Sequence, residues 1–171
     1  MSIPYGLSAL RNISGFRTVS DEAAIVLAGM LPVDILAKEM EKISMARIAT
    51  GDAVSMDVIR SEKVTSMATW QERWNTANMG RWTHKLIPNL EQWIRRRNGE
   101  MNFHLTQFFT GHGGYRKYQC SRFREVVGSV PQPEGLVAFM LEGEDKWSNI
   151  SQLIISIQRD DVKRRDGYCL K

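Results

Sequence analysis

The sequence contains few cysteines and no long apolar run. Its 171 residues include only Cys120 and Cys169, too few for a small scaffold held together by disulfides. No stretch approaches the roughly 20 apolar residues that a membrane-spanning helix needs. Residues 1–15 lack the basic start and apolar run of a signal peptide. These absences predict an intracellular protein of the nucleus or cytoplasm, in a reducing compartment and without a membrane partner.

Common catalytic and cofactor motifs are also missing. The glycine-rich segment Gly111–Gly114 lacks the Gly-Lys-Ser/Thr ending of a phosphate-binding loop, so it predicts a tight turn. Neither a Gly-x-Ser-x-Gly elbow nor a dinucleotide fingerprint is present. Asp160 and Asp161 are followed by the basic run Lys163–Arg165, which favours surface ion pairing over two-metal catalysis. We therefore expect no catalytic residue, no cofactor and no small-molecule substrate.

The histidines and cysteines do not form a recognisable metal motif. His84, His104 and His112 lack the spacing of a helical ligand pair, and Cys120 has no Cys-x-x-Cys partner. A closed four-ligand zinc site would need ligands that the chain does not offer locally, so we expect no metal. A nucleophilic Cys–His pair stays open as an alternative, although an isolated cysteine is more often structural.

Basic charge is concentrated in the middle of the chain. The whole sequence has 23 basic and 19 acidic residues, a net charge of +4, whereas residues 81–124 have nine basic and two acidic residues, a net charge of +7. The same segment holds eight aromatic residues. Basic groups neutralise phosphates and aromatic rings stack on bases, so the pattern favours RNA or DNA as a partner. The alternative is a solvated basic face whose aromatic neighbours lie in the core.

The spacing of apolar residues predicts an all-α fold, an irregular array of helices joined by short loops. Ser20 has the character of an N-cap and Gly29 of a helix end. A helix from Val33 to about Ala49 and a long helix ending at Gly80 should follow. Their expected inward residues are Val33, Leu36, Ala37, Met40 and Ile43 on the first, and Val64, Met67, Trp70, Trp74 and Ala77 on the second.

Further helices are expected toward the C-terminus. They cover a segment opened by Pro88, then Phe103–Phe109, Tyr118–Val127, Glu134–Leu141 and about Asp145 to Arg165. The last should bury Trp147, Ile150, Leu153, Ile154 and Ile157, and the core should include Trp70, Trp74, Trp93 and Trp147. The break at Val130–Pro133 marks the best subdomain boundary, which leaves room for a small C-terminal helical subdomain.

Three groups of short motifs follow one another along the chain. The first comprises Ser14–Ser20, Ala23-Ala24 and Leu27–Pro32. The second comprises Gly80–Thr83, Leu86–Pro88, Trp93, Leu105–Gly113 and Tyr115–Tyr118. The third comprises Cys120–Phe123, Leu136–Leu141 and Trp147. In this order they resemble the region after the polymerase active site in reverse transcriptases of non-LTR (LINE-type) retrotransposons, from about Tyr5 to about Arg165.

The resemblance implies a thumb-like helical segment at residues 1–80, a basic, aromatic-rich linker at 81–128 and a helical tail at 129–171. In the family, this region grips template RNA and target DNA during target-primed reverse transcription. Two features depart from the family. The aromatic-Ala-Asp-Asp polymerase motif and the endonuclease are absent, and of the zinc knuckle only its last ligand has a counterpart, Cys120.

We therefore expect a non-catalytic nucleic-acid-binding remnant or C-terminal fragment of a retrotransposon reverse transcriptase (RNA-directed DNA polymerase) polyprotein. One alternative is the product of a degenerate open reading frame, at most a small helical structural or interaction module. Another is a chain that works only as part of a longer polymerase. His112 and Tyr115 are candidates for placing a loop near the backbone or a base. The candidate phosphate contacts are Arg81, Lys85, Arg95, Arg96, Arg97, Arg116 and Lys117.

Overall fold

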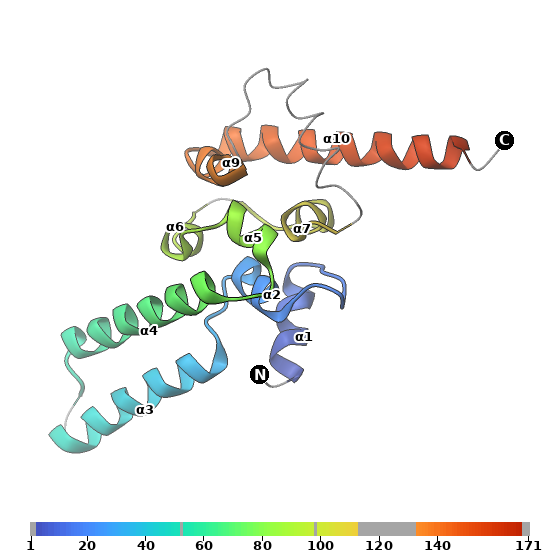
Figure 1. Ribbon diagram of the computed structural model, residues 1–171. Helices are drawn as coiled ribbons and strands as arrows, with labels where there is room; N and C mark the ends of the chain where they lie inside the picture. Colours follow the sequence, from blue (N-terminus) through green and yellow to red (C-terminus); the bar gives the residue numbers. More distant parts are fainter. Residues whose placement is uncertain (1–2, 52, 98, 113–132, 169–171) are drawn as a thin grey trace.

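The computed structural model describes residues 3–51, 53–97, 99–112 and 133–168, and within these ranges all regular structure is helical. The helices are α1 (Ile3–Asn12), α2 (Asp21–Ala28), α3 (Val33–Thr50), α4 (Met56–Thr76), α5 (Arg81–Leu86), α6 (Leu90–Ile94), α7 (Phe103–Thr110), α9 (Pro133–Leu141) and α10 (Glu144–Tyr168). This confirms the all-α expectation. Figure 1 shows three levels, with α1 to α4 below, α5 to α7 in the middle, and α9 and α10 above.

Side-chain caps and glycines set several helix ends. Ser20 accepts a hydrogen bond from the backbone N–H of Ala23 at 3.3 Å, and Gly29 ends α2 in the left-handed region at φ 65°. Asn102 caps α7 in the same way through the N–H of Leu105 at 2.9 Å, and Gly111 ends that helix at φ 68°. The predicted boundaries at Ser20 and Gly29 and the helix end at Gly111 are thus confirmed. Gly113 and Gly114 of the predicted turn lie outside the described residues.

Indole N–H groups tie the helices together, within the middle level and between the middle and lower levels. Three tryptophans each donate a hydrogen bond to a main-chain oxygen of another segment: Trp74 to Ile87 (2.8 Å), Trp82 to Phe108 (2.8 Å) and Trp93 to Val26 (2.7 Å). Trp74 and Trp93 are almost completely buried. Because a buried indole both fills volume and needs a hydrogen-bond acceptor, these contacts fix the relative placement of the elements they join.

The C-terminal helices complete the same core. α9 contacts α5, and α10 contacts α7. The ring of Trp147 lies 6.1 Å from that of Trp93 and 6.5 Å from that of Phe109. The predicted inward side of the last helix and the four predicted core tryptophans are confirmed, with Leu153 half-buried. Described residues of all three predicted segments belong to one buried cluster, and the division into segments stays a prediction.

The sequence interpretation missed two helices and misplaced one helix end. α1 and α5 were not predicted, and the long helix ends at Thr76 rather than at Gly80. Gly80, at φ 69°, instead precedes α5. The end of α4 is closed by Arg81, whose Nη1 donates to the carbonyls of Asn75 and Ala77, each at 3.2 Å. The predicted helix at Tyr118–Val127 and most of the predicted boundary at Val130–Pro133 lie outside the described residues.

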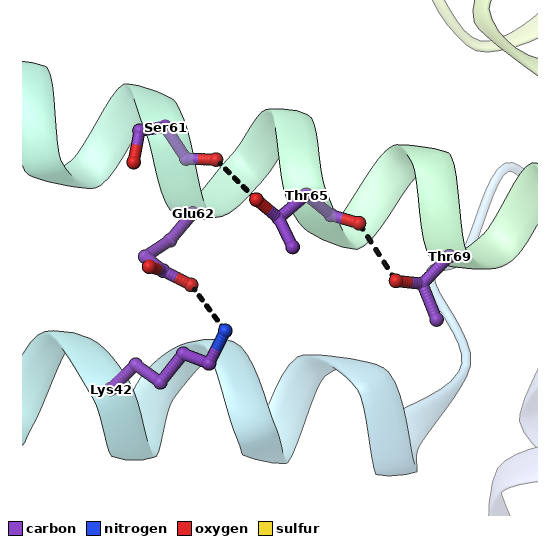
Figure 2. A network of polar contacts seen from close by, with 5 residues as sticks. All are labelled: Lys42, Ser61, Glu62, Thr65 and Thr69. Carbon is purple, nitrogen blue, oxygen red and sulfur yellow. Dashed lines mark hydrogen bonds and ion pairs between the residues drawn. The ribbon is translucent and has the colours of Figure 1, made fainter.

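α3 and α4 form an antiparallel pair that extends away from the other helices, and we call it the arm (Figure 1). At its base, Arg73 forms a two-bond ion pair with Asp34, with N–O distances of 2.9 and 2.6 Å. Farther out, Lys42 pairs with Glu62 at 3.1 Å (Figure 2). Both pairs lie between the helices, so they fix the register of α3 against α4.

The inward side predicted for α3 is wrong for three of its five residues. Leu36 and Met40 are 37% and 61% exposed, and Ala37 is exposed as well, whereas Val33 and Ile43 are half-buried. The side that is buried instead carries Ile35 and Glu39. On α4 the predicted stripe is confirmed for Trp70 and Trp74, with Met67 and Ala77 half-buried, but Val64 is 64% exposed. The physical reason is that α3 touches mainly α4, so its most apolar side has no neighbour in the described part of the chain.

Candidate nucleic-acid interface

The candidate basic residues of the middle segment are carried by α5, α6 and the loop after α6. Thr83 on α5 donates its hydroxyl to the carbonyl of Phe109 at 2.9 Å, which fastens α5 to α7. Gln71 on α4 fastens the start of α6, because its amide donates to the carbonyl of Pro88 and accepts from the N–H of Leu90, both at 2.9 Å. With these contacts in place, the exposed residues of α5 and α6 are Arg81, Lys85, Glu91 and Gln92.

Lys85 and Arg97 are the most available cations of this segment. Both side chains are exposed, and neither forms an ion pair with an acidic group in the described ranges. The described stretch 81–112 has five arginine or lysine residues and two glutamates, a net charge of +3. An excess of exposed, unneutralised cations is the electrostatic requirement for contact with phosphates.

Arg95 and Arg81 are exposed but already engaged. Arg95 pairs with Glu91 one turn earlier at 2.8 Å, with side chains 78% and 55% exposed. Such exposed pairs are worth at most about 1 kcal/mol, so a phosphate can compete for the guanidinium. Arg81 is engaged with the carbonyls at the end of α4 and keeps its charge at the surface. Both residues remain compatible with phosphate contact.

Arg96 is held by contacts within the chain, and its predicted phosphate contact stays a prediction. Its guanidinium carbon lies 3.9 Å from the centre of a Trp93 ring. Its Nη1 donates to the carbonyl of Trp93 at 2.8 Å and its Nε to that of Gly99 at 3.3 Å. Burial lowers the pKa of Arg96 from its ordinary value. A cation held over an indole and bonded to two carbonyls stabilises the turn after α6 rather than reaching outward.

Two of the predicted residues line one open cavity. Arg96 and Arg97 border a hollow of about 410 Å³ next to the ends of α1 and α2, whose other lining residues include Asn12, Gly29 and Glu100. The carboxylate of Glu100 in this lining works against binding of a free anion. The structure therefore brings Arg96 and Arg97 together without forming a closed phosphate pocket.

The other predicted residues lie at or beyond the edge of the described chain. His112 is half-buried, and its Nδ1 lies 3.0 Å from the hydroxyl oxygen of Thr110. Tyr115, Arg116 and Lys117 lie outside the described residues. Their predicted contacts stay predictions.

Most of the described aromatic side chains of the middle segment belong to the core. Trp93, Phe108 and Phe109 are buried, as the alternative interpretation of this segment required. Phe103 is the exposed exception in the described part of this segment, at 44%, and it meets Phe16 edge to face at 5.5 Å. Sequence reasoning missed Phe16 because it lies far from the basic segment, and only its exposure in the fold, at 48%, identifies it.

Within the described ranges, no three histidine, cysteine, aspartate or glutamate side chains gather in a way that could hold a metal ion. No helix in those same ranges is long and apolar enough to cross a membrane.

Comparison with known proteins gives one similarity. No family model matches the chain, and no solved structure matches it. The chain is similar to the "Retrovirus-related Pol polyprotein from type-1 retrotransposable element R1 2" of Nasonia vitripennis, with 30% identity over 127 residues, covering 66% of this chain. The chain spans 30% of the length of that relative. The similarity supports a retrotransposon-related origin, while placement in the C-terminal region of a reverse transcriptase stays a prediction.

Proposed function

We propose that the chain is a non-catalytic nucleic-acid-binding remnant or C-terminal fragment of a retrotransposon reverse transcriptase polyprotein, which contacts template RNA or target DNA. The observation that carries the proposal is the pair of exposed cations Lys85 and Arg97, which have no acidic partner among the described residues. They lie in the segment where the net charge of the whole chain is concentrated. The similarity to a Pol polyprotein supports nucleic acid as the polyanion that this basic surface binds.

The proposed contacts differ in their role. Lys85 and Arg97 bind phosphates directly, Arg81 and Arg95 contribute by exchanging a weak internal contact for a phosphate, and Arg96 holds the turn that presents Arg97. His112, Tyr115, Arg116 and Lys117 remain candidates for further contacts with the nucleic acid. Phosphate contacts carry no sequence information, so this surface binds RNA and DNA with little preference among sequences.

A salt titration tests the proposal. Fluorescence anisotropy measures binding of the purified chain to single-stranded RNA and to duplex DNA between about 50 and 200 mM salt. For the double variant Lys85→Gln with Arg97→Gln we expect weaker binding to every sequence tried. Its slope of log affinity against log salt should be smaller by about 1.4 for RNA and about 1.8 for duplex DNA, because two phosphate contacts are lost.

A matched variant on the arm controls for net charge. Lys38→Gln with Arg60→Gln removes the same two charges from exposed positions on α3 and α4, and its slope should stay that of the unmodified chain. Affinity that does not change with salt, or equal losses in both variants, would contradict the proposal. Extension of a primer by the purified chain would contradict its non-catalytic part. An in-frame polymerase upstream in the genome would identify the chain as a fragment rather than a remnant.

The second candidate function is a small helical structural or interaction module from a degenerate reading frame. It is favoured by the apolar side chains that the arm leaves exposed, among them Met40 and Val64. Absence of salt-dependent binding in the titration would leave this candidate as the better description.

A further inference from the structure

The two sides of the arm differ in chemistry. One side carries a cavity of about 140 Å³ between the helices, lined by Lys38, Lys42, Glu62, Thr65 and Thr69 among others. Figure 2 shows these polar contacts: Lys42 meets Glu62, and the hydroxyls of Thr65 and Thr69 bond back to carbonyls one turn earlier. On this side the polar groups of Lys42, Glu62, Thr65 and Thr69 therefore have partners within the arm.

The opposite side is apolar. At 3.6 residues per turn, residues two positions apart lie on opposite sides of a helix. On α3, Leu36 and Met40 each lie two positions from Lys38, which lines the cavity. On α4, Met67 lies two positions from both Thr65 and Thr69. These three apolar residues therefore face away from the cavity. Leu36, Met40 and Ile43 follow one another at helical spacing on α3, and Val64 and Met67 do so on α4. We call these five residues the apolar face of the arm.

The apolar face is left uncovered. Met40 and Val64 are 61% and 64% exposed and Leu36 is 37% exposed, while Ile43 and Met67 are half-buried. Contiguous exposed apolar side chains indicate an interaction surface, whereas single ones need no explanation. The face follows two antiparallel helices, a shape that accepts a third helix laid along them.

The charges beside the apolar face are positive. Arg47 continues the α3 stripe one turn beyond Ile43, and Lys63 lies one turn before Met67 on α4. Both are exposed and form no ion pair with a described acidic group. Positions 36, 40, 43 and 47 of α3 and positions 60, 63, 64, 67 and 71 of α4 carry no aspartate or glutamate. Asp57, two turns before Val64 on α4, is the nearest acidic residue on that stripe, and it pairs with Arg60 at 3.7 Å. The face therefore offers apolar contact flanked by unneutralised positive charge.

We propose that the apolar face of the arm binds an acidic amphipathic helix of a partner protein. Leucine-like side chains of that helix would cover Leu36, Met40 and Met67, and its flanking carboxylates would pair with Arg47 and Lys63. A second copy of this chain fits less well, because face-to-face docking would bring the same positive charges together. Nucleic acid also fits less well, because the centre of the face is aliphatic and has no aromatic ring for stacking.

A designed peptide tests the proposal on the full chain. The probe is a fluorescent 18-residue helix with leucines in one stripe and glutamates on both flanks. The same peptide with lysine in place of every glutamate is the charge control. We expect the acidic peptide to bind and the basic one to bind at least about tenfold more weakly, because the charge sign at the rim is reversed.

The arm offers a matched pair of methionines as a control. Met40 and Met45 lie on the same helix and are 61% and 64% exposed, but Met45 shares the side of Lys38 and Lys42. Met40→Ser should weaken peptide binding about tenfold, since burial of a methionine is lost. Met45→Ser should change it by less than about twofold. Arg47→Gln with Lys63→Gln should weaken binding more at low salt, whereas Arg11→Gln with Arg17→Gln should not.

Several outcomes would overturn the proposal. No binding of the acidic peptide, equal binding of the basic peptide, or equal effects of Met40→Ser and Met45→Ser would each do so. A dimer seen by light scattering and abolished by Met40→Ser would assign the face to a second copy. Loss of RNA binding in Met40→Ser but not in Met45→Ser would assign it to nucleic acid. Because the nucleic-acid titration uses Lys85 and Arg97, either proposal can fail without the other.

Discussion

Gly99 is a single residue on which the middle and upper levels of the molecule both depend. Its φ of 107° lies in the region that favours glycine, and its carbonyl accepts the bond from Arg96. A Cβ at this position would lie 2.8 Å from ring atoms of Trp147. The ring cannot move away freely, because Trp147 is buried against Trp93 and Phe109. The position therefore tolerates no side chain without rearrangement.

We expect Gly99→Ala to lower the free energy of unfolding by about 2–3 kcal/mol, from backbone strain together with displacement of the Trp147 ring. Urea unfolding followed by tryptophan fluorescence measures the loss. Gly143→Ala is the matched control, because a Cβ there meets no atom within 4 Å. That variant should change stability by less than about 0.5 kcal/mol. Equal stabilities for the two variants would show that Trp147 does not pack against Gly99 as described.

Sequence reasoning at the residue scale succeeded for large apolar groups, but it did not reveal the contacts that one cation makes within the chain. The tryptophans were predicted to lie in the core because an indole ring has a large apolar area, which is removed from water mainly in the protein interior. Arg96 was predicted as a phosphate contact, yet it lies over Trp93. The spacing of three residues between them allows that contact in a helical turn, but spacing alone does not decide between a ring and a phosphate as the partner of an arginine.

At the scale of elements, a helix could be predicted where its own sequence contains capping residues or apolar periodicity. A helix held mainly by contacts with other helices could not. α2 has its cap at Ser20 and its glycine at the end, and both signals are visible in the sequence. α5 is only six residues long and is held by Trp82 and Thr83 to the carbonyls of α7. A helix that short has little intrinsic stability, so no periodic pattern reveals it.

The orientation of α3 shows a second limit. Leu36 and Met40 do lie at helical spacing on one side of the helix, as predicted. That side was expected to face the core, but it is exposed. α4 covers the side that carries Ile35 and Glu39 because the ion pairs of Asp34 and Lys42 select that contact. Periodicity indicates that a helix has an apolar side, whereas which neighbour covers it depends on the partner helix.

The Asp34–Arg73 ion pair should contribute measurably to anchoring the arm. Each side chain is 46% exposed, and the geometry is a two-bond one, so we expect a coupling energy of about 0.5–1 kcal/mol at pH 7. A double-mutant cycle with Asp34→Asn and Arg73→Gln, followed by urea unfolding, measures it. The Asp57–Arg60 pair, longer at 3.7 Å and more exposed, is the control and should give a coupling near zero.

The same coupling should depend on pH in a defined direction. The hydrogen bond and charge of Arg73 lower the pKa of Asp34 from its ordinary value of 3.8. A carboxyl group whose pKa is lowered by folding contributes its stabilisation above the unfolded value, and loses it as pH falls through the lower, folded value. The cycle should therefore give its full coupling at pH 7 and progressively less below the ordinary pKa. An undiminished coupling after protonation would contradict an ionic origin.

At the scale of the whole molecule, burial is unevenly distributed. In the middle and lower levels, α7 is buried from Leu105 to Thr110 and α2 from Ala23 to Leu27. Along the arm, by contrast, α3 has no buried residue after Glu39, and α4 has none before Ser66. In the described part of the chain, the outer arm depends mainly on contacts between α3 and α4. The two surfaces proposed above, one for nucleic acid and one for a partner helix, therefore lie on parts of the chain that differ in stability.

Native-state hydrogen exchange should separate these parts. Regions with few buried contacts open locally, at a lower free energy than the whole chain unfolds. We expect backbone amides in the second half of α3 and the first half of α4 to exchange at least about tenfold faster than those of α7, and with less dependence on urea, because local opening exposes less surface. Mass spectrometry of peptides from each region measures both quantities. If the outer arm instead exchanges at the rate of α7, the arm opens only with the core.

Binding of the acidic helix peptide should slow amide exchange in the outer arm and leave the exchange of α7 unchanged, because a ligand stabilises the state to which it binds.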